Sequence, residues 1–168
     1  MEAPHPLITR ERLRSVLRPQ PGERLLEVGV GTGYYSCELA EWVGPEGTLE
    51  LFDLQQEFLD HVMRAAGERG LSNLVPTQGD ATRLPYEDAS VDAVVLTAVL
   101  GEIPDPGAAL REIRRVLRPE GRLVVGELFG DPHFTPLGSL RRQSNQAGLA
   151  YKDHSGNWFG YFARLSPA

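Results

Sequence analysis

The stretch Leu25-Leu26-Glu27-Val28-Gly29-Val30-Gly31-Thr32-Gly33 decides the fold of this chain. An apolar run ends in an acid, and three glycines follow at alternate positions. The pattern predicts a buried strand that runs into a tight turn and opens a helix. Glycine adopts positive φ at little cost, and without a Cβ it lets a ligand approach the backbone. The free amides of a helix start favour a polar or anionic group, but such a turn alone does not distinguish a nucleotide-like ligand from a structural role.

Apolar and polar stretches alternate around this turn in a regular order of strand and helix. Such alternation predicts a doubly wound, Rossmann-like α/β fold with a mostly parallel sheet and right-handed crossovers. The predicted strands are Arg24–Val28, Thr48–Phe52, Leu74–Thr77, Val91–Thr97 and Arg122–Glu127, the last one after a turn at Pro119-Glu120-Gly121. The predicted helices begin at Thr9, span Tyr34–Val43 and Gln56–Glu68, and begin again at Asp105-Pro106.

The pattern changes after Phe129, where the regular alternation ends. A loop at Gly130–Pro136 and a short polar helix at Leu137–Ala147 are predicted. Two segments rich in aromatic and apolar residues, Leu149–Lys152 and Trp158–Leu165, then flank a polar stretch at 153–157. We interpret them as an antiparallel hairpin that brings the sheet to about seven strands.

The length of 168 residues suits a single domain. We divide it into an N-terminal arm and helix at 1–20, a core at 22–130, and a helix plus terminal hairpin at 131–168. Within the arm, residues 1–6 are expected to be irregular.

Composition excludes several classes of function. The net charge of −6 disfavours a nucleic-acid partner. The single Cys37 excludes an internal disulfide and a cysteine-rich zinc site, and His5, His61 and His154 are too scattered to predict a metal site. The chain begins without a signal-peptide pattern, and its longest apolar stretch is too short to cross a bilayer, so we expect a cytoplasmic protein with no membrane partner.

Polar residues close four successive strands of the predicted sheet. In open parallel sheets, ligands bind at the carboxyl ends of the strands, near the point where the strand order reverses. An acid at the end of the second strand is well placed to accept both hydrogen bonds of a ribose diol. These residues are Glu27, Asp53, Asp80 and Thr97. Any one of these acids alone is better explained as a solvated loop carboxylate, whereas the set predicts a site.

The ordered motifs resemble those of the class I S-adenosylmethionine-dependent methyltransferases. They are Leu26–Gly33, Phe52-Asp53-Leu54, Gly79-Asp80-Ala81 with Leu84-Pro85, Val91–Val94 and Leu110–Val125. The resemblance covers roughly residues 10–130. It is closest to the small-molecule branch that includes the ubiquinone/menaquinone-biosynthesis C-methyltransferases, and it predicts methyl transfer to a small-molecule acceptor.

The resemblance also implies a role for individual residues. Gly29, Gly31 and Gly33 would let the methionine part of S-adenosylmethionine lie against the backbone, with Glu27 beneath it. The remaining cofactor contacts are Asp53 to the ribose, Leu54 to the adenine face, Asp80 and Ala81 to the adenine edge, and the backbone of Leu96 and Thr97 to the methionine end. Tyr34 either closes over that end or packs in the core, and Gln55 either faces the cofactor or caps a helix.

The acceptor side is less defined by the motifs. Only the arm, the Ala98–Pro106 loop and Gly130–Pro136 are available to cover it, so we expect either an open site or one completed by a homodimer partner or another chain. Candidates for a general base are Glu102 and His133. Glu102 is equally consistent with a cap of the following turn, and His133 is better explained as a loop histidine without a role.

Two other functions compete with methyl transfer. One is a nicotinamide-dependent oxidoreductase, because Asp53 lies where such folds place the ribose acid. The Gly-x-Gly-x-Gly spacing disfavours it, and it leaves Asp80-Ala81 without a role. The other is a non-catalytic module that binds S-adenosylmethionine and works with a partner, which the short chain suggests.

Overall fold

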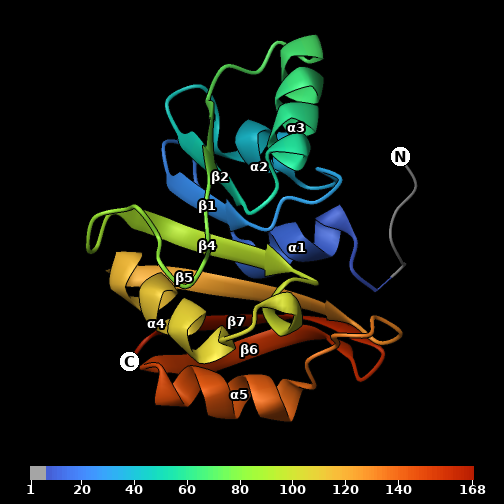
Figure 1. Ribbon diagram of the computed structural model, residues 1–168, viewed down its shortest axis with the longest axis vertical. Coiled ribbons are helices and arrows are strands. Elements are labelled where there is room, and N and C mark those ends of the chain that lie inside the picture. Colours follow the sequence, from blue (N-terminus) through green and yellow to red (C-terminus); the bar gives the residue numbers. More distant parts are fainter. Residues whose placement is uncertain (1–6) are drawn as a thin grey trace.

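A single seven-stranded sheet runs through the computed structural model, which describes residues 7–168 (Figure 1). The strand order is β3-β2-β1-β4-β5-β7-β6. Neighbouring strands from β3 to β5 are parallel, while β7 runs antiparallel to both β5 and β6. The strands are β1 (Arg24–Val28), β2 (Thr48–Asp53), β3 (Leu74–Gln78), β4 (Val91–Thr97), β5 (Leu117–Leu128), β6 (Leu149–Asn157) and β7 (Gly160–Pro167). The predicted fold class is therefore confirmed, while the predicted arm at 1–6 lies outside the described residues.

Helices cover both faces of the sheet (Figure 1). Side chains of α1, α2 and α3 pack in one apolar cluster, and those of α4 and α5 pack in a second cluster on the opposite face. The helices are α1 (Arg10–Leu17), α2 (Ser36–Val43), α3 (Gln56–Glu68), α4 (Pro106–Val116) and α5 (Leu137–Gln146), with a 3-10 turn, η1 (Leu100–Glu102), before α4.

The middle positions of the central strands are apolar at both parities because both faces of the sheet are covered. Along β1, Leu25 packs with the α1–α3 cluster and Leu26 with the α4–α5 cluster. Along β4, Ala93 and Val94 divide in the same way. Successive side chains of a strand point to opposite faces, so a strand in the middle of a covered sheet needs apolar residues at both parities.

The predicted starts of β5 and α2 were wrong. Strand β5 begins at Leu117, directly after α4, so the predicted turn at Pro119-Glu120-Gly121 lies within the strand. The reason is that Leu117 already pairs with Val91 across an irregular register. Helix α2 begins at Ser36, two residues later than predicted, because the turn after the glycines continues through Tyr35.

The terminal hairpin is longer than predicted. Residues 153–157, expected to form its loop, are part of β6, and the turn lies at Trp158-Phe159. These polar residues pair with β7, and Asp153 forms an ion pair with Arg164 across the strands. Since β6 is an edge strand with exposed positions, its polar composition does not prevent strand formation.

The topology determines where a ligand can bind. Strand β1 lies at the centre of the five parallel strands, with β2 and β3 on one side and β4 and β5 on the other, so the strand order reverses next to β1. Open α/β sheets bind ligands in the crevice outside the carboxyl ends of the strands at this point. The β6–β7 turn lies at the same edge, because β7 begins opposite Leu128 at the carboxyl end of β5.

Candidate functional site

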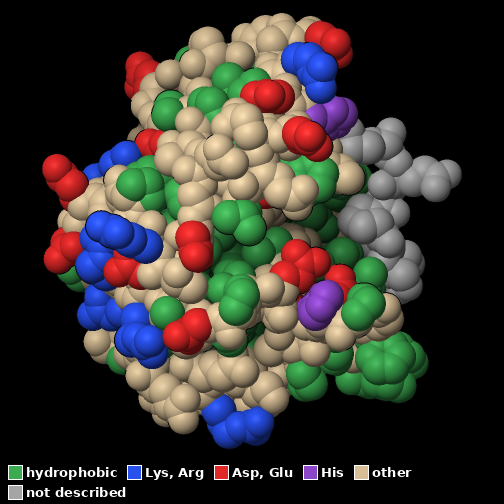
Figure 2. Space-filling model, viewed as in Figure 1, with side chains coloured by type: hydrophobic (Ala, Val, Ile, Leu, Met, Phe, Trp, Pro, Cys, Tyr) green, Lys and Arg blue, Asp and Glu red, His purple; other side chains and the backbone are tan. Residues whose placement is uncertain are grey.

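A cleft of about 640 Å³ lies at the carboxyl edge of the sheet. Its walls come from the glycine turn after β1, the ends of β2, β3 and β4, and the segment that includes η1. The corresponding face of the molecule is hollowed near its middle, with apolar and acidic side chains gathered around the hollow (Figure 2). The two ends of the predicted site, the glycine turn and Asp80-Ala81, therefore line one cavity.

Each of the three glycines of the turn is required for its own reason. All three have positive φ, at +75°, +49° and +73° for Gly29, Gly31 and Gly33. A Cβ at Gly29 would lie 2.3 Å from Val99 Cγ2, and one at Gly33 would lie 2.6 Å from Val62 Cγ2. A Cβ at Gly31 would meet nothing within 4 Å. Gly29 and Gly31 line the cleft, whereas Gly33 packs behind it, so Gly31 leaves open space for a ligand.

Glu27 is a buried acid beneath the turn. Its side chain lines the cleft, the residue is only 4% exposed, and Oε2 has no hydrogen-bond partner among the described residues. Burial raises the pKa of this carboxyl to about 8; the neighbouring Ser36 hydroxyl acts to lower it, and the nearby charge of Asp53 acts to raise it. A buried carboxyl oxygen without a partner is costly and indicates a place for a donor from outside the protein.

Asp53 ends β2 with its carboxylate directed at two backbone amides. Its Oδ1 accepts from Gln55 N at 2.9 Å, and its Oδ2 accepts from Gly31 N at a longer 3.4 Å. The residue is 7% exposed and lines the cleft. Gln55 stands at the N-cap position of α3 but makes no side-chain capping bond, and it also lines the cleft.

Asp80 and Ala81 form the opposite end of the cleft, after β3. Asp80 Oδ1 accepts from the backbone N and from Oγ1 of Thr82, both at 2.8 Å, and the backbone bond in particular lowers the Asp80 pKa. Leu54 also lines the cleft and is 69% exposed, unusual for a large apolar side chain. Its backbone oxygen accepts from Gln78 Nε2 at 3.0 Å, which ties the ends of β2 and β3 together.

Of the residues predicted at the end of β4, the structure brings only one to the cleft. Thr97 lines it, with Ala98 and Val99 following. Leu96 is fully buried in the α4–α5 cluster and is not part of the lining. Tyr34 lines the cleft rather than the deep core, and the Arg10 guanidinium lies over its ring at 4.0 Å from the centroid.

The two candidate bases lie near each other, but only one lines the cleft. Glu102 is in the lining and 57% of its side chain is exposed, while the cap of α4 is Asp105. His133 Nδ1 lies 4.0 Å from Glu102 Oε1 and 3.8 Å from Asp131 Oδ1. A Cβ at Gly101 would lie 1.8 Å from His133 O, so the η1 segment and the loop after β5 are in direct contact.

Glu127, at the end of β5, is a buried acid that sequence reasoning missed. It is 1% exposed, Oε2 accepts from Thr135 N at 3.0 Å, and Oε1 has no partner among the described residues. Burial raises its pKa to about 7. Tyr161, opposite Glu127 in the β5–β7 ladder, donates to Thr135 O at 2.6 Å. Side chains of β5 and β7 therefore both bind the loop after β5 at Thr135. The sequence could have indicated it, because Glu127 ends the fifth predicted strand just as Glu27, Asp53, Asp80 and Thr97 lie at the ends of the first four.

The described residues 7–168 contain neither a candidate metal centre nor a helix that could span a membrane. Within this range, no three His, Cys, Asp or Glu side chains are grouped as metal ligands would be. In the same part of the chain, none of the helices has the length and apolar character needed to cross a membrane.

Comparison with known proteins gives a consistent picture. Residues 26–125 match the methyltransferase domain family. A demethylmenaquinone methyltransferase of Beutenbergia cavernae is 38% identical over 131 residues, which are 78% of this chain and 51% of that protein. A ubiquinone/menaquinone biosynthesis C-methyltransferase of Caulobacter vibrioides is 35% identical over 136 residues, which cover 76% of this chain and 52% of that protein. The chain therefore spans about half the length of these relatives.

A solved structure shares the whole architecture. The crystal structure of an S-adenosylmethionine-dependent methyltransferase from Aquifex aeolicus superposes with a TM-score of 0.84, at 22% sequence identity. The superposition covers 94% of this chain and 90% of that one. At this identity the likeness establishes the fold.

Burial of Glu127 predicts a pH-dependent stability. Its folded-state pKa of about 7 exceeds the unfolded value near 4.5, so the folded protein binds the extra proton between these values and stability falls as pH rises through them. Glu127→Gln should therefore match the wild type at pH 4 and be more stable at pH 8, by about 3 kcal/mol at most. Urea unfolding at both pH values measures this difference. Glu102→Gln, at an exposed position, is the control, and an equal effect of Glu127→Gln at both pH values would contradict the prediction.

Proposed function

We propose that this chain, which belongs to the class I S-adenosylmethionine-dependent methyltransferase family, transfers a methyl group from that cofactor to a small-molecule acceptor. The observation that carries the proposal is the cleft itself. It joins an open glycine turn to acids at the ends of β1, β2 and β3, the arrangement that a nucleoside with an amino-acid tail requires.

The cleft residues fit the two ends of S-adenosylmethionine. Open space at Gly31 suits the methionine part, and the unpartnered Oε2 of Glu27 suits its amino group. Asp53 would accept from the ribose hydroxyls in place of its long bond to the Gly31 amide. Asp80, Ala81 and the exposed Leu54 would hold the adenine.

The bound cofactor supplies an activated methyl group, and the protein contributes mainly positioning and exclusion of water. The apolar side chains of Val99 and Ile103, beside Pro104, form the wall of the cleft next to Thr97. An acceptor that enters along this wall passes Glu102, which is placed to take a proton from a weakly acidic acceptor. His133 would act only through Glu102, since it does not line the cleft.

Asp53 should dominate cofactor affinity if this assignment is correct. We expect micromolar binding of S-adenosylhomocysteine by calorimetry, and a loss of at least about tenfold in Asp53→Ala, because charged hydrogen bonds to the ribose are removed. Glu46→Ala, an exposed turn acid away from the cleft, is the control. Wild-type protein that binds neither S-adenosylmethionine nor its demethylated product would remove the proposal.

Binding should also release a proton from Glu27. Near pH 7 this carboxyl, with its raised pKa of about 8, is mostly protonated in the free protein, and pairing with the ligand ammonium favours the ionised form. Affinity for S-adenosylhomocysteine should therefore rise from pH 6 to pH 8. Calorimetry in buffers of different ionisation enthalpy should give close to one proton released at pH 7. Glu27→Gln should abolish this release, and an unchanged release in that variant would assign the proton elsewhere.

A homodimer is proposed to complete the acceptor side. Three aromatic residues at this edge of the sheet, Phe129, Trp158 and Phe159, are 54%, 67% and 42% exposed and contact one another. Such a cluster suits a second copy of the chain, which would cover the open end of the cleft. Light scattering should give twice the monomer mass at micromolar concentration, and Trp158→Glu should give monomers. A monomeric wild type would rule out this arrangement.

A further inference from the structure

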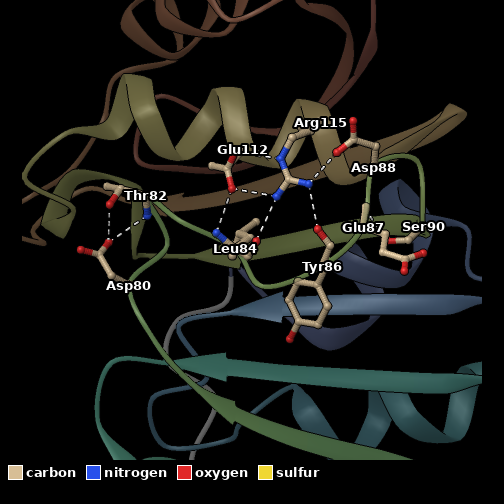
Figure 3. A network of polar contacts seen from close by, with 9 residues as sticks. All are labelled: Asp80, Thr82, Leu84, Tyr86, Glu87, Asp88, Ser90, Glu112 and Arg115. Atoms are coloured by element: carbon tan, nitrogen blue, oxygen red, sulfur yellow. Dashed lines mark hydrogen bonds and ion pairs between the residues drawn. The ribbon is translucent and has the colours of Figure 1, made fainter.

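The adenine end of the cleft lies on a segment without regular secondary structure. Residues 79–90 connect β3 to β4, and Asp80 and Ala81 stand at its beginning. A segment of this kind loses much conformational freedom when it is held in one shape, so something must fix it if Asp80 is to be preorganised. The contacts that fix it converge on the last turn of α4 (Figure 3).

Arg115 is the centre of these contacts. Its Nη2 donates to Leu84 O at 2.9 Å and its Nη1 donates to Tyr86 O at 2.8 Å. Nη1 also donates to Asp88 Oδ1 at 2.8 Å, and Nε and Nη2 bind the Glu112 carboxylate in a two-pronged pair, both at 2.8 Å. One guanidinium therefore holds the segment at three successive alternate residues, a geometry that only the planar fork of arginine provides.

Glu112 binds the second backbone group of Leu84. Its Oε2 accepts from Leu84 N at 2.9 Å, while Arg115 binds the carbonyl of the same residue. The hydrogen bond from Arg115 lowers the Glu112 pKa, which keeps this acceptor ionised at neutral pH. The Leu84 side chain is 4% exposed and packs in the α4–α5 cluster. Leu84 is thus held by both backbone groups and by its side chain.

The turn that carries Asp80 ends at this anchor. Asp80 O accepts from Arg83 N at 2.9 Å, and Asp80 Oδ1 accepts from Thr82, two residues before Leu84. On the other side, Gly79 N donates to Asp53 O at 3.0 Å, which fixes the start of the turn to the end of β2. The direction of the Asp80 carboxylate therefore depends on the sheet at one end and on α4 at the other.

We propose that Arg115 and Glu112 are positioning residues for adenine recognition, which act by holding Leu84 so that the Asp80–Thr82 turn faces the cleft. The inference rests on the proposed function, because it takes the adenine of S-adenosylmethionine as the group that Asp80 recognises. It assigns selectivity for the 6-amino group of a purine to an ion pair that lines no part of the cleft.

A purely structural clamp would lower stability without changing which purine is preferred. The test therefore compares two ligands, S-adenosylhomocysteine and S-inosylhomocysteine, which differ at the adenine edge: a 6-amino group and an acceptor N1 are replaced by a 6-oxo group and an N1–H. Wild-type protein should prefer the adenosyl compound by about tenfold, the size of one charged hydrogen bond. Asp80→Asn and Arg115→Met should each reduce this preference towards one, and the double variant should show no further loss because both act through one contact.

Folding is controlled separately from selectivity. Binding is measured at a temperature where circular dichroism shows each variant fully folded. Arg111→Met, at an exposed position one turn earlier on α4, is the matched control and should keep the wild-type preference. Glu112→Gln is the second variant, since it keeps an oxygen for Leu84 N while it weakens the pair with Arg115, and it should lose part of the preference.

The outcomes separate the inference from the function on which it rests. If wild-type protein binds neither ligand, the proposed function fails. If it binds both equally, Asp80 does not read the amino group and the inference fails with it. If it discriminates, and folded Arg115→Met or Glu112→Gln discriminates equally well, the positioning role is overturned while the proposed function stands.

Discussion

The glycine turn after β1 is packed closely against the η1 segment and against α3, and the rest of the site depends on this packing. Gly29 packs against Val99 and Gly33 against Val62, at distances where a Cβ would overlap. The end of β1 is thereby held between the η1 segment and α3. Because both outer glycines are committed to packing, only Gly31 remains open, and the cleft forms over it. The turn backbone is thus packed against other residues at Gly29 and Gly33 and is open at Gly31, where a ligand could approach it.

The two buried acids at strand ends, Glu27 and Glu127, lower the stability of the folded protein. Glu27 and Glu127 are both buried with one carboxyl oxygen unpartnered, and burial raises the pKa of each. A core selected for stability alone would not keep such groups, since unpaired buried polar atoms are unfavourable. They lie at the ends of β1 and β5, the edge where open α/β sheets bind ligands, in agreement with the role proposed for Glu27, and Glu127 lies at the same edge.

Most of the architecture could be predicted because it depends on patterns of period two and 3.6. The five parallel strands and the helices between them follow from such patterns, and the family resemblance follows from the ordered motifs between Leu26 and Val125. Predictions failed where tertiary pairing overrides local signals. Polar residues 153–157 form a strand because β7 offers partners, and Pro119 lies in a strand because Leu117 pairs with Val91. Propensity is a weak guide when long-range hydrogen bonds are available.

The candidate site divides in the same way. By itself, the sequence determined which strand ends carry polar groups, because strand ends and glycine turns are local in the chain, and so it identified Glu27, Asp53 and Asp80. Only the tertiary structure decided which groups reach the cleft: it brings Thr97 and Glu102 to the lining and leaves Leu96, Gly33 and His133 outside. It alone connects Arg115 to Leu84, 31 residues away. The physical reason is that side-chain direction and long-range hydrogen bonds depend on packing between elements, which local sequence does not encode.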